Sequence, residues 1–258
     1  MPAPDLPPPP QFTATERPLH VHLHVKLVAP EALAGAVVVV IDALRASVTM
    51  TAALAHGASC VVPALTVEQA LAEKSRYPGA VLGGERGGVL IPGFDLDNSP
   101  GKYTADRVKG KAVIFTTTNG TAALLNSAKA AEIVVGSFAN LSAVCEAVRS
   151  DPRTVHVVCC GTRDEFSLDD VLPAGAFVER LTASGRQLDA EDSARIALMA
   201  WRGALAAPVG LVEAMRQSRG GRNLERQGLG ADVDFCATLD TLPVVPRFDP
   251  HRGVVTLR

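Results

Sequence analysis

Six short apolar runs alternate along the chain with segments whose spacing favours α-helix. Residues 20–28 alternate polar and apolar side chains, which is typical of a strand with one buried face at the edge of a sheet. Residues 36–41 are apolar on both faces, as a central strand covered on both sides requires. Shorter apolar runs predict further strands at 59–62, 112–115, 133–135 and 155–160.

The segments between these strands have the signals of helices. Alanine-rich stretches follow two of the strands, and Gly57 suits the C-cap of the first helix. Thr66 and Gln69 have the spacing of a capping box, which predicts a helix start. We therefore expect helices at residues 43–56, from 66 onwards, at 122–131, from 140 onwards, at 173–182 and beyond 189.

Strands that alternate with helices imply right-handed crossovers between parallel strands. The predicted fold class is α/β, a three-layer α/β/α sandwich with a mixed or mostly parallel sheet. An eightfold barrel would need more units at wider spacing. Residues 1–18 hold seven of the 18 prolines and predict a disordered tail. Residues 19–258 then form one folded domain, in which two structurally similar halves remain open.

Composition excludes several classes of partner. Lysine plus arginine number 25 and aspartate plus glutamate 27, so the net charge of −2 gives no basic field for nucleic acid. The five cysteines contain no C-x-x-C pair and predict reduced, buried thiols. No apolar run approaches the roughly 20 residues of a membrane span. The proline-rich opening does not show the basic region and apolar run of a signal peptide, so we expect a cytoplasmic protein without a membrane partner. A homo-oligomer remains open.

Ligands of open α/β sheets collect at the carboxyl ends of the strands, so the polar loops there are the candidate sites. The first such loop holds Asp42, Arg45 and Ser47 directly after the apolar run at 36–41. An aspartate at the end of a buried strand needs a cation or hydrogen-bond donors beside it. A helix N-cap with a local ion pair explains Asp42 equally well.

The second loop has the sequence Thr-Thr-Thr-Asn-Gly-Thr at residues 116–121. Its hydroxyls, its amide and the free N–H groups of a helix start can surround a phosphate without positive charge. The spacing of a P-loop is absent. A capped Asn-Gly turn is the alternative interpretation of the same residues.

The third region places glycines around Glu85 and Arg86 and continues to Asn98 and Ser99. Its carboxylate and carbonyl oxygens are the hard ligands that magnesium prefers, although an ordinary mobile loop has the same composition. Two more carboxylates, Asp169 and Asp170, follow the strand at 155–160, where a plain helix start is the alternative.

Taken together, these segments resemble the 2-phosphosulfolactate phosphatase family, and the similarity extends to Asp234, over nearly everything after the tail. The family consists of magnesium-dependent acid phosphatases associated with coenzyme M biosynthesis, with a three-layer α/β fold. The chain differs from the usual family residues at Ala43, Asp97, Cys160 and Asp169, and Asp97 adds a negative charge beside the expected anionic substrate. The matching segments are residues 39–47, 84–88, 93–100, 116–121 and 166–170, followed by 174–175, 192–197 and 220–224.

The resemblance implies that residues 19–258 are a phosphatase domain that hydrolyses the phosphate monoester of a small anionic acid, 2-phosphosulfolactate, to sulfolactate and phosphate. The residues implied as catalytic are Asp42, Arg45, Glu85, Arg86 and Asn119. Those implied as substrate-binding are Ser47, Asn98, Ser99, Thr117, Thr118, Gly120 and Thr121. Those implied as magnesium ligands, directly or through water, are Asp42, Glu85, Asp169 and Asp170.

Two chemical routes and two other functions stay open at this stage. A metal-activated water is the favoured nucleophile, because Leu44 stands where the Asp-x-Asp phosphatases that form a phosphoaspartate have their second acid. A phosphoaspartate on Asp42 is the alternative route. The alternating His20, His22 and His24 could instead serve a zinc-dependent hydrolase, and a catalytically silent protein could retain the phosphate site for binding alone.

Overall fold

The β-branched run predicted as a central strand forms β2 (Val37–Ile41), all of it buried, in the computed structural model, which describes residues 17–188 and 191–257. β2 pairs in parallel with β7 (Glu132–Gly136) and with β8 (Val155–Cys159). Val39 packs into one apolar core and Val38 into the other, on the opposite face of the sheet. Both faces are thus covered, which is the arrangement of a three-layer sandwich.

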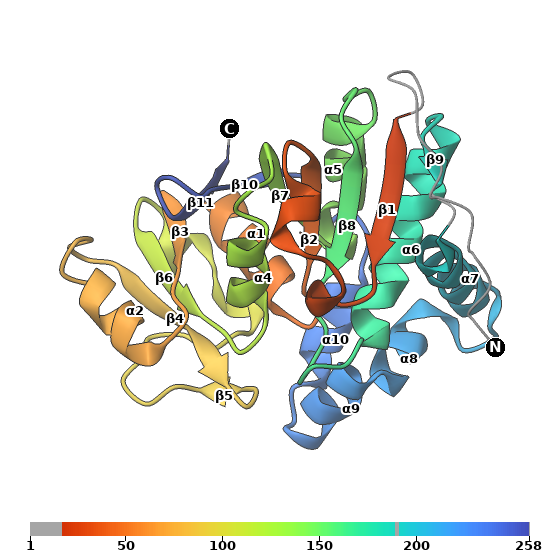
Figure 1. Cartoon of the computed structure of the whole chain (residues 1–258). Helices are drawn as coiled ribbons and strands as arrows, with labels where there is room; N and C mark the ends of the chain where they lie inside the picture. Colours follow the sequence, from red (N-terminus) through yellow and green to blue (C-terminus); the bar gives the residue numbers. More distant parts are fainter. Residues whose placement is uncertain (1–16, 189–190, 258) are drawn as a thin grey trace, which may run out of the picture.

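The eleven strands of the described residues form one mixed, mostly parallel sheet in the order β5-β4-β6-β3-β11-β10-β7-β2-β8-β1-β9 (Figure 1). One parallel group is β4-β6-β3 and the other is β7-β2-β8-β1-β9, and the hairpin of β10 and β11 joins them in antiparallel pairing. The other strands are β1 (Pro18–His22), β3 (Cys60–Pro63), β4 (Val81–Arg86), β5 (Val89–Leu90), β6 (Ala112–Thr116), β9 (Gln187–Leu188), β10 (Pro246–Asp249) and β11 (Val254–Leu257).

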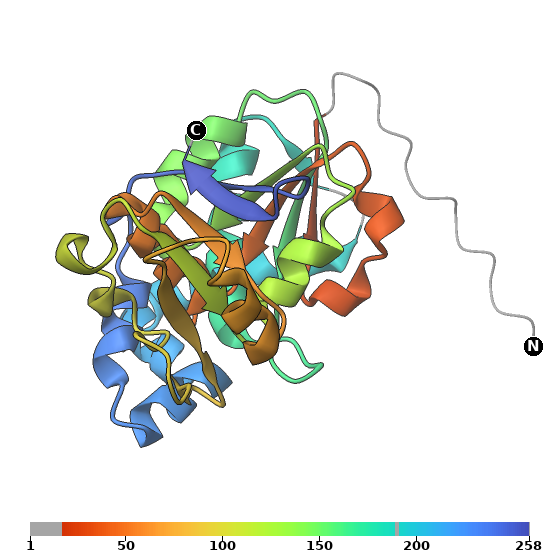
Figure 2. The same ribbon diagram turned by 90° about the vertical axis from the view of Figure 1, so that its left-hand side faces the viewer.

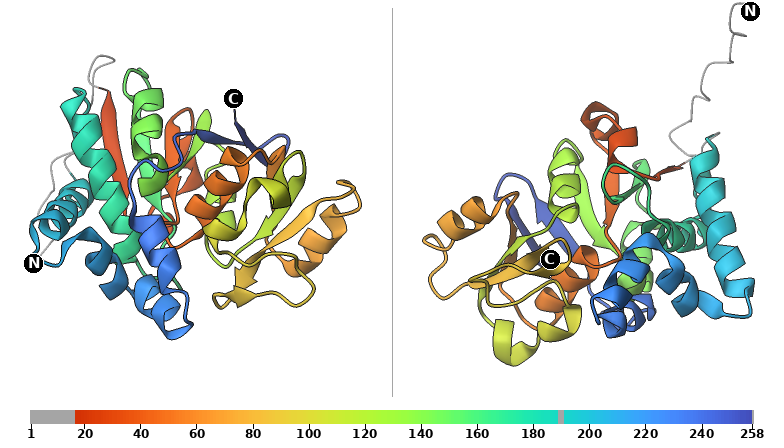
Figure 3. Two further views of the ribbon diagram at one scale, coloured as in Figure 1. Left: turned by 180° about the vertical axis from the view of Figure 1, so that it is seen from behind. Right: turned by 90° about the horizontal axis from the view of Figure 1, so that it is seen from below.

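Helices lie on both sides of the sheet (Figure 2). From behind, α6 and α7 cover one face, and α8, α9 and α10 gather at the carboxyl ends of β2 and β8 (Figure 3). The helices are α1 (Ala46–Ala55), α2 (Val67–Glu73), α3 (Ala105–Val108), α4 (Gly120–Asn126), α5 (Leu141–Val148), α6 (Leu168–Ala183), α7 (Asp192–Ala206), α8 (Gly210–Gln217), α9 (Arg219–Arg226) and α10 (Gly230–Ala237). Short 3-10 turns are η1 (Val25–Leu27), η2 (Pro30–Leu33), η3 (Pro100–Lys102) and η4 (Phe138–Asn140).

The first strand is shorter than predicted and starts earlier. β1 begins at Pro18, inside the predicted tail, and ends at His22. It ends there because His24 caps η1, its Nδ1 accepting the Lys26 N–H at 3.0 Å. β1 lies between β8 and β9 and is therefore not the edge strand. The prediction of a disordered tail falls on residues 1–16, which lie outside the described residues.

A loop was predicted where the structure has β4. Gly84 pairs with Thr116 of β6 at a φ of +132°, and a Cβ there would lie 2.0 Å from the Thr116 carbonyl oxygen. Glycine is thus needed for close approach of two strands and does not mark a loop here.

The two parallel groups are not consecutive halves of the chain. Residues 60–116 supply β3, β4 and β6, whereas the other group takes strands from both sides of that segment. The similarity of two halves stays a prediction. Across the part of the chain that the structure describes, every helix is too short or too polar to cross a bilayer.

Candidate active site

A cavity of about 700 Å³ opens at the carboxyl ends of the strands, between the β4-β5 hairpin and α9. All five residues predicted to be catalytic line it, together with three of those predicted to bind substrate, which are Asn98, Thr117 and Thr118. The sequence motifs of four separate segments therefore meet at one place. The five are Asp42, Arg45, Glu85, Arg86 and Asn119.

Asp42 follows β2 directly and is held by the first turn of α1. The Ala46 N–H donates to Oδ1 of Asp42 at 3.2 Å. The other carboxylate oxygen, Oδ2, lies against Gly120, where a Cβ would be only 2.9 Å away. Burial, together with the charges of Asp169 and Glu85, raises the pKa of Asp42 to about 7. An ionised Asp42 therefore needs a cation at neutral pH.

Glu85 fastens the β4-β5 hairpin to the loop after β6. Its Oε1 accepts the N–H and the hydroxyl of Thr118 at 2.9 and 3.0 Å, and its Oε2 accepts the Gly88 N–H at 2.6 Å. Arg86 braces the same loop, donating to the Glu85 carbonyl at 2.7 Å and to the Thr116 hydroxyl at 2.8 Å. Both side chains thus shape the cavity wall as well as lining it.

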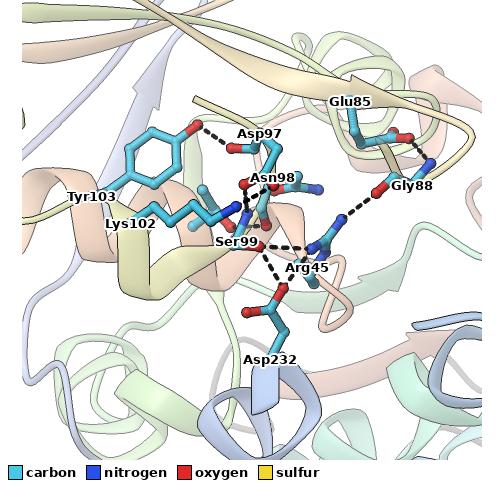
Figure 4. Close-up of polar contacts among 10 residues, drawn as sticks. Arg45, Glu85, Gly88, Asp97, Asn98, Ser99, Lys102, Tyr103 and Asp232 are labelled. Carbon is cyan, nitrogen blue, oxygen red and sulfur yellow. Dashed lines mark hydrogen bonds and ion pairs between the residues drawn. The ribbon is translucent and has the colours of Figure 1, made fainter. Parts of the chain in front are cut away.

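Arg45 is only 2% exposed and connects four segments (Figure 4). Its Nη1 donates to Ser99 Oγ at 3.1 Å and to Asp232 Oδ2 at 2.5 Å, and its Nη2 donates to the Gly88 carbonyl at 2.9 Å. The Ser99 hydroxyl donates to the same Asp232 oxygen at 2.7 Å. Arg45 therefore holds α10 and the hairpin against the start of α1, and Ser99 is one of its partners.

Of the four carboxylates predicted to hold magnesium, Asp42 and Glu85 line the cavity, whereas Asp169 and Asp170 are not among its lining residues. Asp170 is buried, and its two oxygens accept the N–H groups of Ala43 and Gly161 at 2.8 Å each. It thereby joins the ends of β2 and β8, and burial raises its pKa. Asp169 accepts the Ser167 hydroxyl at 2.5 Å and is covered by Gly220 of α9.

Four residues predicted to bind substrate are also absent from the cavity wall: Ser47, Ser99, Gly120 and Thr121. Ser47 Oγ accepts the Asp42 N–H at 2.8 Å, so it positions the backbone of Asp42 without lining the cavity. Gly120 leaves room for the Asp42 carboxylate, because a Cβ at this position would lie 2.9 Å from Asp42 Oδ2 and 2.8 Å from the Ala46 Cβ. Thr121 is buried in the first turn of α4.

Asp97, the unusual charge noted in the sequence, does not reach the cavity either. Lys102 donates to its Oδ2 at 2.6 Å and the Ser99 N–H to its Oδ1 at 3.0 Å. Burial raises the pKa of Asp97, but these hydrogen bonds outweigh burial and leave the pKa below its ordinary value. Asp97 therefore adds no negative charge to the cavity.

Two buried polar atoms at the cavity have no hydrogen-bond partner within residues 17–188 and 191–257: Asn98 Oδ1 and Thr117 Oγ1. Buried polar groups are almost always paired. A hydroxyl and an amide left unpaired at a cavity indicate that a bound molecule or water completes them.

Sequence reasoning missed the arginines of the far wall and Asp232. Arg163 follows β8, and α9 contributes three more arginines. A polar helix face with several arginines has the pattern of an ordinary solvated face, so only the likeness of residues 220–224 to the family signalled it. The arginines of this wall are Arg163, Arg219, Arg222 and Arg226.

The histidines considered for zinc do not converge. His20 and His22 stack on His156 of β8, with ring centroids 4.7 and 5.2 Å away and nearly parallel planes. His24 is turned into its cap with Lys26. His22 Nε2 lies 2.9 Å from His156 Nδ1, so these two rings pair with each other. No group of three or more potential ligands that could hold a metal occurs among the described residues.

A smaller donor set at the cavity does suit magnesium. Mg²⁺ keeps several waters and is often bound by one or two carboxylates together with substrate phosphate. Asp42 and Glu85 both line the cavity, and burial and neighbouring carboxylates raise the pKa of Asp42 despite the nearby charge of Arg45. The residues present therefore fit a two-carboxylate magnesium site.

The family suggested by the sequence motifs is also the one found by comparison with known proteins. The family model described as 2-phosphosulpholactate phosphatase matches residues 23–251. A probable 2-phosphosulfolactate phosphatase of Symbiobacterium thermophilum is 42% identical over 236 residues, which cover 90% of this chain and 99% of that protein. Proteins of the same name from Deinococcus radiodurans and Caldanaerobacter subterraneus subsp. tengcongensis are 41% and 39% identical, each over 84% of this chain and over 90% and 89% of those proteins. The chain belongs to the 2-phosphosulfolactate phosphatase family.

Proposed function

We propose that this protein hydrolyses 2-phosphosulfolactate to sulfolactate and phosphate, in service of coenzyme M biosynthesis as the family resemblance implies. The observation that carries the proposal is the charge of the cavity wall. Six arginines and two carboxylates line the cavity, in a chain whose net charge is −2. A concave site with such an excess of positive charge attracts polyanions, and a phosphate ester of an acid with a carboxylate and a sulfonate is one.

The phosphate end of the substrate is assigned to the strand ends. Thr117 has an unpaired hydroxyl oxygen there, and Asn119 and Arg86 line the same wall. Their hydroxyl, amide and guanidinium donors suit phosphoryl oxygens whose charge grows in the transition state. Because Glu85 and Arg86 are fixed by hydrogen bonds to neighbouring loops, little reorganisation is needed when the phosphate binds.

Magnesium is assigned to Asp42 and Glu85. The support is that both carboxylates line the cavity and that burial with neighbouring carboxylates raises the pKa of Asp42, so a nearby cation would favour its ionised form. When bound, the ion would neutralise phosphoryl oxygens and polarise the phosphorus toward attack.

Attack by water is favoured over attack by Asp42 itself. Leu44 lines the cavity two residues after Asp42 and has no proton to exchange with a leaving group. An aspartyl route would also need one oxygen of Asp42 to approach phosphorus in line, whereas Oδ1 accepts the Ala46 N–H and Oδ2 lies against Gly120. Water attack leaves Asp42 and Glu85 in place throughout.

Phosphate release tests the proposal. The metal-free protein would be incubated with 2-phosphosulfolactate, phospholactate or phenyl phosphate, each with magnesium or with EDTA. We expect phosphate to be released fastest from 2-phosphosulfolactate with magnesium and not at all with EDTA. No release from any of the three, with EDTA making no difference, would refute the phosphatase and leave a phosphate-binding protein.

A further inference from the structure

The cavity face of α9 carries positive charge that the helix itself does not balance. Arg219, Arg222 and Arg226 are spaced three and four residues apart and all line the cavity. Like charges at this spacing repel on a helix surface. The acid on this helix, Glu225, accepts from Arg216 of α8 at 2.9 Å.

Two arginines of the far wall have side chains without a hydrogen-bond or ion-pair partner among the described residues. In the described parts of the chain, the guanidinium groups of Arg163 and Arg226 make no hydrogen bond or ion pair with another residue. Arg222 donates one N–H to the Gln217 carbonyl and keeps its other donors. Arg219 differs, because Glu165 accepts from it at 2.5 Å.

The backbone places Arg163 at some cost. Arg163 and the next residue, Asp164, have φ values of +50° and +67°, in a region that residues other than glycine rarely adopt. Strain of this kind is commonly retained where a side chain must be presented to a ligand.

α9 crosses from one side of the cavity to the other. Near its start, Arg219 pairs with Glu165 of the loop after β8. Just after its end, Gln227 Nε2 donates to the Gly87 carbonyl of the β4-β5 hairpin at 2.9 Å. Arg222 and Arg226, on α9, lie between these two attachments, on a wall other than the strand ends, where the phosphate is assigned.

We propose that Arg163, Arg222 and Arg226 bind the carboxylate and sulfonate of the substrate and so select phosphate esters with two further anionic groups. The inference rests on the proposed function. The planar guanidinium presents paired N–H donors that match carboxylate and sulfonate oxygens. The three arginines are specificity-determining residues, and the reacting phosphate is bound elsewhere in the same cavity.

Substitution of each arginine by glutamine tests the assignment through substrate discrimination. In Arg222→Gln and Arg226→Gln, we expect the ratio of kcat/KM for 2-phosphosulfolactate to kcat/KM for phenyl phosphate to fall about tenfold, mainly through KM. Arg163→Gln should act in the same direction. Arg202→Gln on α7 is the matched control, since it removes a surface arginine that pairs with Glu179 far from the cavity.

Calorimetry separates this inference from the proposed reaction. Sulfolactate has the carboxylate and sulfonate without the phosphate, whereas inorganic phosphate has neither. We expect Arg226→Gln to weaken sulfolactate binding about tenfold and phosphate binding less than twofold. Equal weakening of both ligands, no weakening of sulfolactate, or no binding of sulfolactate by the unaltered protein would overturn the assignment. If sulfolactate binding depends on Arg226 but no ester is hydrolysed, the proposed reaction fails and the arginine subsite stands.

Discussion

Replacing Asp42 by asparagine should make the metal-free protein more stable near pH 8 while abolishing phosphate release. The folded state raises the pKa of Asp42 from 3.8 to about 7. The folded protein therefore holds a proton on Asp42 between these values, whereas the unfolded chain has lost it. Stability falls as pH rises through this window, and the whole penalty is present above about pH 7.

The size of the penalty follows from the two pKa values. Each unit of pKa difference corresponds to about 1.4 kcal/mol, so a rise of about three units costs up to about 4 kcal/mol at pH 8. Asparagine is neutral at every pH, and its Oδ1 can still accept the Ala46 N–H. A gain of 2 to 4 kcal/mol would raise the melting temperature by roughly 4 to 16 °C for a domain of this size.

Thermal unfolding of EDTA-treated protein from pH 4.5 to 8.5 measures this gain. The difference between Asp42→Asn and the unaltered protein should be small at pH 4.5 and grow toward pH 8. Asp106→Asn is the control, because a hydrogen bond from Thr104 lowers the pKa of this exposed carboxylate on α3 from 3.8, so its difference from the unaltered protein should not change between pH 4.5 and 8.5. A constant difference across the pH range, or a less stable Asp42→Asn at pH 8, would show that Asp42 is not a buried uncompensated charge.

Three further substitutions test the supports of the cavity. Asp232→Asn should lower the unfolding free energy by about 3 kcal/mol in urea titrations, because it leaves the buried guanidinium of Arg45 without its charged partner. An unchanged urea midpoint would contradict the role of Asp232 in holding Arg45. Gly84→Ala should lower the unfolding free energy by more than about 3 kcal/mol, since its Cβ would lie 2.0 Å from the Thr116 carbonyl oxygen. Gly93→Ala, at a position with positive φ but open space, should lower it by only about 1 kcal/mol. Equal losses of unfolding free energy in the two variants would show that contact with the Thr116 carbonyl does not explain Gly84. Ser47→Ala should lower kcat more than it raises KM, because Ser47 positions Asp42 without lining the cavity; a change confined to KM would restore its predicted contact with substrate.

The order of strands and helices and the place of the site could be predicted because both follow from local patterns. The apolar run at 36–41 had to be a central strand, so Asp42 had to lie at its carboxyl end among the other strand-end loops. The roles of Asp169 and Asp170 could not be predicted in this way. Their orientation depends on Gly220 of α9 and on the N–H groups of two neighbouring strand ends, which only the folded chain brings together.

β4 and the wall of α9 were missed for different physical reasons. The paired glycines of β4 have the composition of a loop, and only the close approach to β6 and Tyr103 explains them. The arginines of α9 have the composition of a solvated helix. They line the cavity because Gln227 and Arg219 attach that helix to its two sides.

The most direct test of the account is phosphate release from 2-phosphosulfolactate by the metal-free protein, before and after magnesium is added, beside Asp42→Asn under the same conditions. We predict no release without the ion, sustained release once it is added, and none from the variant in either case. Release by Asp42→Asn at the rate of the unaltered protein, or release that ignores magnesium, would contradict the assignment of this cavity and its carboxylates to the reaction.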